Sequence, residues 1–136
     1  MKHEKSCGAV VYRAENGKLT ILVEHMVQGH CSIPKGHVEG SETEAETALR
    51  EIREETALRV ELDTGFRRVI TYSPGPGVEK DVVFFAARAL DGEIEPQLCE
   101  LHSARFLPLA EALDALTFES DRETVRQAAE YITKYQ

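Results

Sequence analysis

The feature that most constrains the fold is a glutamate-rich segment from Gly36 to Leu58, GHVEGSETEAETALREIREETAL. It contains a helix-start pattern, because Ser41 stands three residues before Glu44 and each side chain can accept the other's backbone N–H. Apolar residues then recur at helical spacing, as Ala45, Ala48, Leu49 and Ile52. The sequence therefore predicts a helix from Ser41 to about Thr56 with one buried face.

Three carboxylates on this helix predict a metal site. Glu51, Glu54 and Glu55 are three and four residues apart, so they project from one side of a helix. Like charges at this spacing repel by about 0.2–0.5 kcal/mol per pair, and a cation between them turns that repulsion into binding. Oxygen-only ligands favour Mg²⁺ or Mn²⁺ over zinc. If only the spacing of the glutamates is considered, a solvated acidic surface is the alternative to a metal site.

Positive groups flank these carboxylates. Arg50 precedes Glu51 and can orient one carboxylate through a bidentate pair. The turn Pro34–His37 can offer a backbone carbonyl to a metal and a cation to a phosphate. We therefore expect this turn to face the acidic side of the helix.

The remaining elements follow from periodicity and turn residues. A hairpin is predicted where Asn16-Gly17 joins two apolar runs, since this pair tolerates positive φ. A capping pattern of Ser120 and Glu123 predicts a last helix to about Tyr135. Strands are predicted at 7–12, 19–23, 60–72 (broken near Gly65), 81–90 and 105–107, a helix at 109–115, and loops at 26–32 and 73–77. This order, β-β-α-β-β-β-α-α, predicts an α+β fold with a mixed sheet.

Length, charge and composition limit the function. The 136 residues predict one domain spanning residues 1–136. A net charge of −8 argues against electrostatic binding to DNA. The absence of a run of about 18 apolar residues argues against a membrane span. The N-terminal residues lack the apolar stretch of a signal peptide, and the three cysteines, Cys7, Cys31 and Cys99, form no C-x-x-C pair. We expect a cytoplasmic protein with reduced thiols, while the sequence does not indicate an oligomeric state.

The glutamate-rich segment resembles the signature of the Nudix hydrolases, G-x5-E-x7-R-E-U-x-E-E-x-G-U with U aliphatic. The matching residues are Gly36, Glu42, Arg50, Glu51, Ile52, Glu54, Glu55 and Leu58. Ala57 is the one departure, since the family usually has glycine there. A residue just past a helix often has positive φ, and in that conformation Ala57 would cost about 1 kcal/mol.

The resemblance implies a fold and a mechanism. The fold is an α/β/α sandwich with a mixed sheet and the signature as loop–helix–loop. The activity is hydrolysis of a phosphoanhydride bond with Mg²⁺ or Mn²⁺, and the catalytic residues are Arg50, Glu51, Glu54 and Glu55. By position Glu51 and Glu55 are the main metal ligands, the carbonyl of Lys35 is a further ligand, and Glu54 is either a third carboxylate ligand or a support. The signature does not settle the general base.

Two further segments resemble the diadenosine tetraphosphate hydrolase-like branch of this family. They are Pro34–Glu39, PKGHVE, and Ser6–Ala9, SCGA. The implied partner is a small nucleotide, most of all a bis(5′-nucleosyl) tetraphosphate. The phosphates of such a substrate need cations, and the candidates are Lys35, His37 and Lys80. Its bases need aromatic rings on which to stack, and the candidates are Tyr72 and Phe118. Glu100 stands before Arg105-Phe106-Leu107 at a spacing similar to a catalytic or metal-binding glutamate of the branch.

Each assignment has a simpler alternative. Lys80 and Tyr72 can be exposed without touching a ligand, Phe118 can belong to the core, and Glu100 can be a solvated loop charge. The branch commonly has Trp where this chain has Cys31, which points to a weaker adenine site or to another nucleotide. The rival substrates are a nucleoside triphosphate, an RNA 5′ end, ADP-ribose and a diphosphoinositol phosphate. A non-catalytic nucleotide sensor is disfavoured, because every signature glutamate is present.

Overall fold

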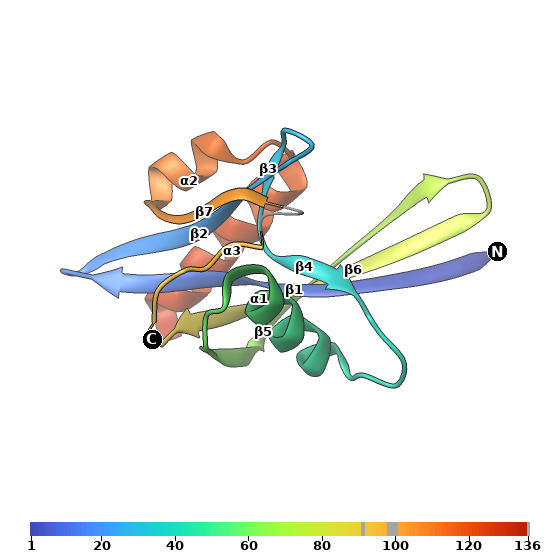
Figure 1. Ribbon diagram of the computed structural model, residues 1–136, viewed down its shortest axis with the longest axis horizontal. Coiled ribbons are helices and arrows are strands. Elements are labelled where there is room, and N and C mark those ends of the chain that lie inside the picture. Colours follow the sequence, from blue (N-terminus) through green and yellow to red (C-terminus); the bar gives the residue numbers. More distant parts are fainter. Residues whose placement is uncertain (91, 98–100, 136) are drawn as a thin grey trace.

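The computed structural model describes residues 1–90, 92–97 and 101–135, which form a mixed β-sheet between helices (Figure 1). The elements are β1 Lys2–Glu15, β2 Lys18–Met26, β3 Cys31–Ser32, β4 Lys35–His37, α1 Glu44–Thr56, β5 Val60–Gly75, β6 Val78–Ala89, β7 Leu101–Pro108, α2 Leu109–Ala115 and α3 Glu119–Tyr135. The predicted α+β class and the order of the longer elements are confirmed. The short strands β3 and β4 were not predicted.

Strand β1 is the centre of the sheet, whose strand order is β3-β2-β1-β6-β5. One edge of β1 runs parallel to β6 from Lys2 to Tyr12. Its other edge is divided, with β4 antiparallel at Ser6–Gly8 and β2 antiparallel at Tyr12–Glu15. Strand β7 continues the sheet by pairing with β2. The division of that edge lets β4 approach the middle of the sheet from the direction of α1.

Side chains of β1 enter two cores, one on each face of the sheet. Val10 points into the core beneath α2 and α3, whereas its neighbour Val11 points into the core beneath α1. A strand buried on both faces carries a near-continuous apolar run, as the sequence of β1 does. Figure 1 shows α1 and α3 on opposite sides of the strands. No helix within the described residues is long and apolar enough to cross a membrane.

The capping residue of helix α1 lies two positions later than predicted. It is Thr43, whose hydroxyl accepts from the Glu46 N–H while the Glu46 carboxylate accepts from the Thr43 N–H. The prediction of Ser41 was therefore wrong. Leu49 was also predicted to be buried but is 40% exposed, because the buried stripe runs through Ala48, Ile52 and Glu55.

Three more local predictions differ from the structure. Residues 60–75 form one strand, and the expected break near Gly65 is a register shift between Asp63 and Arg67. The loop expected at 73–77 is reduced to a turn at Pro76–Gly77, since β5 continues to Gly75. Helix α3 starts at Glu119, so Ser120 lies within its first turn and is not its cap.

Ala57 adopts the left-handed conformation at the end of α1, with φ 63° and ψ 5°. This backbone is costly for alanine and easy for glycine, although the freedom of glycine in the unfolded chain offsets part of the gain. We expect Ala57→Gly to raise the free energy of unfolding by about 0.5–1 kcal/mol in a urea denaturation measurement.

Ala45 inside α1 is the matched control for this substitution. Ala45→Gly places glycine in regular helical backbone and should lower the free energy of unfolding by about 1 kcal/mol. A loss of stability in Ala57→Gly would contradict the strain that we assign to Ala57.

Candidate active site

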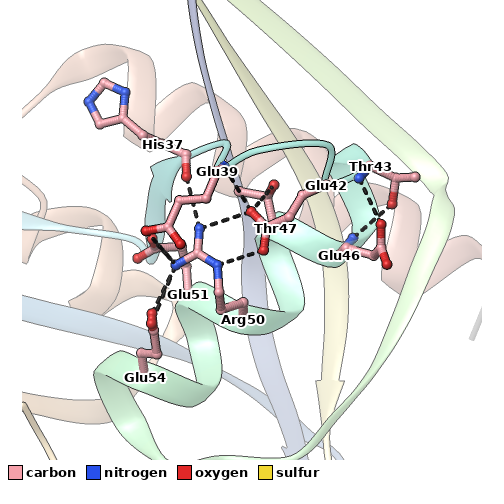
Figure 2. A network of polar contacts seen from close by, with 9 residues as sticks. All are labelled: His37, Glu39, Glu42, Thr43, Glu46, Thr47, Arg50, Glu51 and Glu54. Carbon is pink, nitrogen blue, oxygen red and sulfur yellow. Dashed lines mark hydrogen bonds and ion pairs between the residues drawn. The ribbon is translucent and has the colours of Figure 1, made fainter.

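Arg50 joins the loop before α1 to the helix itself (Figure 2). Its guanidinium donates two hydrogen bonds to the Glu42 carboxylate, Nε to Oε2 at 2.7 Å and Nη2 to Oε1 at 3.1 Å. Nη1 donates to Glu51 Oε1 at 2.8 Å and to Glu54 Oε1 at 2.9 Å. Nη2 also donates to the His37 carbonyl at 2.9 Å. The expected bidentate pair therefore exists, with Glu42 as its carboxylate.

The same network fixes the charge state of Glu42. The bond from Arg50, followed by those from the Glu39 N–H and the Thr47 hydroxyl, lowers the pKa of Glu42 from 4.5 to about 2. The carboxylates around Arg50 in turn raise the pKa of its guanidinium. The loop is therefore held to α1 by groups that stay ionised at neutral pH.

Two glycines allow β4 to lie against its neighbours. A Cβ on Gly36 would fall 2.0 Å from Cδ of Glu51, so the Glu51 carboxylate packs directly on the β4 backbone. A Cβ on Gly8 would fall 1.9 Å from the Pro34 carbonyl oxygen. Both distances are far below contact, so a side chain at Gly8 would displace the β4 backbone and one at Gly36 would displace the Glu51 carboxylate. The signature carboxylate Glu51 is thus positioned by Arg50 on one side and by backbone on the other.

A cavity of about 540 Å³ lies between β4, α1, the end of β2 and the turn that follows it. Its lining comprises Ser6, Met26, Val27, Gln28, Lys35, Gly36, His37, Glu39, Glu51, Glu55 and Lys80. We call it the carboxylate cavity. It brings together five residues predicted from the sequence: Lys35, His37, Glu51, Glu55 and Lys80. Burial, together with the like charge of Lys35, lowers the pKa of Lys80.

Two predicted carboxylates do not join this cavity. Glu54 does not line it, since its side chain is half-exposed and binds Arg50. Glu100 lies outside the described residues. Within the described ranges no three His, Cys, Asp or Glu side chains form a group that could hold a metal ion. Glu51 and Glu55 therefore line the cavity as a pair, while the role of Glu54 as a third ligand or a support stays a prediction.

This pair still fits a divalent cation. Glu51 and Glu55 offer carboxylate oxygens in one cavity, and β4 brings backbone against Glu51. Hard oxygen donors of this kind suit Mg²⁺ and Mn²⁺, which keep several water ligands when bound by one or two carboxylates. Glu55 is 3% exposed, so a cation in the cavity would stabilise its buried negative charge.

A second cavity, of about 380 Å³, adjoins the first at Lys35. Its lining consists of Lys35, Ile70, Tyr72, Val82, Phe84, Phe118, Ser120 and Asp121, and we call it the aromatic cavity. Tyr72 and Phe118 are 45% and 50% exposed. The alternative that Phe118 belongs to the core is therefore wrong. His30 approaches Phe118, with ring centroids 5.7 Å apart.

Sequence reasoning missed Asp121. It is buried in the first turn of α3 yet lines the aromatic cavity. The available signal was its position three residues after Phe118, which places both side chains on one side of a helix start.

Comparison with known proteins identifies the family. The family model described as NUDIX domain matches residues 2–128. This chain belongs to the Nudix hydrolase family. It is accordingly an enzyme that hydrolyses pyrophosphate bonds.

Several relatives cover nearly the whole Nudix chain. The mouse bis(5′-nucleosyl)-tetraphosphatase [asymmetrical] is 31% identical over 140 residues, which cover 94% of this chain and 95% of the mouse protein. An 8-oxo-(d)GTP phosphatase of Mycolicibacterium smegmatis is 34% identical over 90% of this chain, which spans 40% of that protein. The crystal structure of a C. elegans Ap4A hydrolase binary complex has a TM-score of 0.87 and 22% identity, covering 97% of this chain and 99% of that chain. This likeness confirms the α+β Nudix fold with its mixed sheet and three helices.

The Arg50–Glu42 pair should make stability depend on pH. The folded state lowers the pKa of Glu42 from 4.5 to about 2, so the ionised carboxylate stabilises the fold above pH 4.5 and this contribution is lost toward pH 2. We expect Glu42→Gln to lower the free energy of unfolding at neutral pH, and the difference from wild type to shrink as pH falls through this window. Urea denaturation at a series of pH values measures it.

Glu39→Gln is the control for this pH series. The Glu39 carboxylate is 69% exposed and approaches Arg50 only to 3.7 Å, so its removal should matter little at any pH. A Glu42→Gln difference that stays constant from neutral pH to about pH 2 would contradict the assigned pair.

Proposed function

We propose that the enzyme is an asymmetrical bis(5′-nucleosyl)-tetraphosphatase, which cleaves diadenosine tetraphosphate to ATP and AMP. The observation that carries this proposal is the meeting of the carboxylate cavity and the aromatic cavity at Lys35. A dinucleoside polyphosphate needs a polar site for its phosphates and an adjoining apolar site for a base. The near full-length likeness to the mouse tetraphosphatase supports the same substrate class.

The carboxylate cavity is where the phosphate chain would bind. Glu51 and Glu55 would hold the metal ion together with the Lys35 carbonyl. When bound, Mg²⁺ or Mn²⁺ lowers the pKa of a water molecule and neutralises charge that develops on phosphorus. Arg50 keeps Glu51 in one orientation through the 2.8 Å bond, which makes it a positioning residue rather than a ligand.

The lysines at this cavity supply charge for the phosphates. Lys35 lines both cavities and Lys80 lines the carboxylate cavity. Their mutual repulsion, part of what lowers the pKa of Lys80, is relieved when an anion lies between them. His37 lines the same cavity, and its ring points away from the guanidinium of Arg50 (Figure 2). The polyphosphate therefore meets cations along the path from the carboxylates to the aromatic rings.

Glu55 provides the direct test of the hydrolytic role. Glu55→Gln preserves shape and removes the charge offered to the metal, so we expect turnover of diadenosine tetraphosphate to fall at least about 100-fold. Glu54→Gln is the comparison variant, and it should lose less activity because Glu54 lies outside the carboxylate cavity. Circular dichroism would establish that both variants are folded. Wild-type turnover by Glu55→Gln would contradict the assignment.

The substrate class is tested with a panel in the presence of Mg²⁺. It contains diadenosine tetraphosphate, a nucleoside triphosphate, ADP-ribose, 5′-triphosphorylated RNA and a diphosphoinositol phosphate, with the products identified by chromatography. A preference for diadenosine tetraphosphate with ATP and AMP as products supports the proposal. A preference for another diphosphate would leave the family chemistry intact and overturn this substrate.

The aromatic cavity generates a separate prediction. Base stacking on an aromatic ring contributes about 1–3 kcal/mol by alanine substitution, so Tyr72→Ala and Phe118→Ala should each raise KM for diadenosine tetraphosphate about 5- to 100-fold. We expect kcat to change much less, because both rings lie away from Glu51 and Glu55. Tyr135→Ala is the control, since this ring is 62% exposed at the end of α3 and lines neither cavity. Unchanged KM in both cavity variants would contradict base stacking there.

A further inference from the structure

Asp121 is a buried acid on the wall of the aromatic cavity. Asp121 is 6% exposed, and it lines the cavity together with Tyr72 and Phe118. Within residues 1–90, 92–97 and 101–135 its carboxyl group has no hydrogen bond or ion pair. Burial raises the pKa of Asp121, while Lys35, His30 and Arg122 act more weakly in the opposite direction. A buried polar group without a partner is costly, so this one is available to a ligand.

Helix stability alone does not explain this placement. An acid in the first turn of a helix interacts favourably with the helix dipole, and α3 has two, Glu119 and Asp121. Glu119 does so from an exposed position, with 66% of its side chain accessible, and it pairs with Arg122 at 3.0 Å and Arg126 at 2.8 Å. The dipole effect therefore needs no burial, whereas Asp121 is buried beside the cavity.

The other walls of the cavity indicate what the carboxyl group would meet. Ile70, Val82 and Phe84 supply apolar side chains, and Tyr72 and Phe118 supply half-exposed rings. Such a space suits a flat aromatic ligand with a polar edge. A carboxyl oxygen accepts hydrogen bonds, and the exocyclic amino group of a nucleobase donates them. When the carboxyl group is ionised, a base with a carbonyl oxygen in that place would set two acceptors against each other.

We propose that Asp121 determines base specificity by accepting a hydrogen bond from the 6-amino group of an adenine held in the aromatic cavity. The proposal rests on the proposed function, since it assigns the base that this cavity receives. It goes beyond stacking, because aromatic rings accept any base while a buried acceptor distinguishes one edge from another. The aromatic rings therefore provide affinity for the base, and Asp121 provides specificity for adenine.

Binding of two nucleotides that differ by one amino group tests this role. Isothermal titration calorimetry would compare AMP with purine riboside 5′-monophosphate, which lacks the 6-amino group. We expect wild type to bind AMP about tenfold more tightly, as a hydrogen bond to an acidic group implies. Asp121→Ala should bind both nucleotides equally, and Asp121→Asn, which keeps an acceptor oxygen, should recover part of the preference.

Glu119→Ala is the matched control, because it removes the other first-turn acid of α3 without touching the cavity. This variant should keep the tenfold preference for AMP. Kinetics give a second readout: Asp121→Ala should raise KM for diadenosine tetraphosphate and leave kcat close to wild type, since the lost contact is made equally in the ground and transition states.

Three results would overturn the proposal. One is equal binding of the two nucleotides by wild type, which needs no variant and so decides the matter even if Asp121→Ala fails to fold. Another is an equal loss of affinity for both nucleotides in Asp121→Ala, which indicates a structural role only. The third is loss of the preference in Glu119→Ala. If diadenosine tetraphosphate is hydrolysed while wild type shows no preference for AMP, this inference fails and the proposed function stands.

Discussion

The site depends above all on the guanidinium of Arg50. It binds Glu42 before the helix, the His37 carbonyl at the end of β4, and Glu51 and Glu54 on the helix itself. Loop, strand and helix are thereby fixed to one planar group whose donors have set directions. Because Gly36 lets the Glu51 carboxylate rest on the β4 backbone, that side chain is confined from two sides. The Glu51 carboxylate is thus held in a fixed orientation, as binding a cation in a defined geometry requires.

Local signals predicted the elements whose determinants are close in sequence. The Asn16-Gly17 turn has positive φ at both residues, as expected for this hairpin, and α2 has the predicted bounds. The start of α1 could not be chosen locally, because Ser41 and Thr43 both precede a glutamate by three residues. In the structure Thr43 is the cap, and Glu42, which binds Arg50, lies before the helix. Strands β3 and β4, of two and three residues, are too short for any periodicity.

The site was predicted as far as its signature extends. Lys35, His37, Glu51 and Glu55 come from one continuous segment, and the structure places them around one cavity. Glu54 shows the limit, since helical spacing placed it with the other carboxylates, but in the structure it binds Arg50 and does not line the cavity. Asp121 belongs to a helix start with no recognisable pattern, and its burial follows from how α3 packs across the sheet. Such positions depend on contacts between distant segments, which spacing in one sequence does not encode.

Among the described residues, Lys35 alone lines both cavities, and β6 contributes Lys80 to the first and Val82 and Phe84 to the second. α1 provides the carboxylates of Glu51 and Glu55, whereas β5 and the segment at the start of α3 provide the rings and the buried acid. Changes at one set of walls therefore leave the other set in place. Substitutions around Tyr72 or Asp121 can therefore change which leaving group the enzyme accepts without altering the carboxylates of the hydrolytic half.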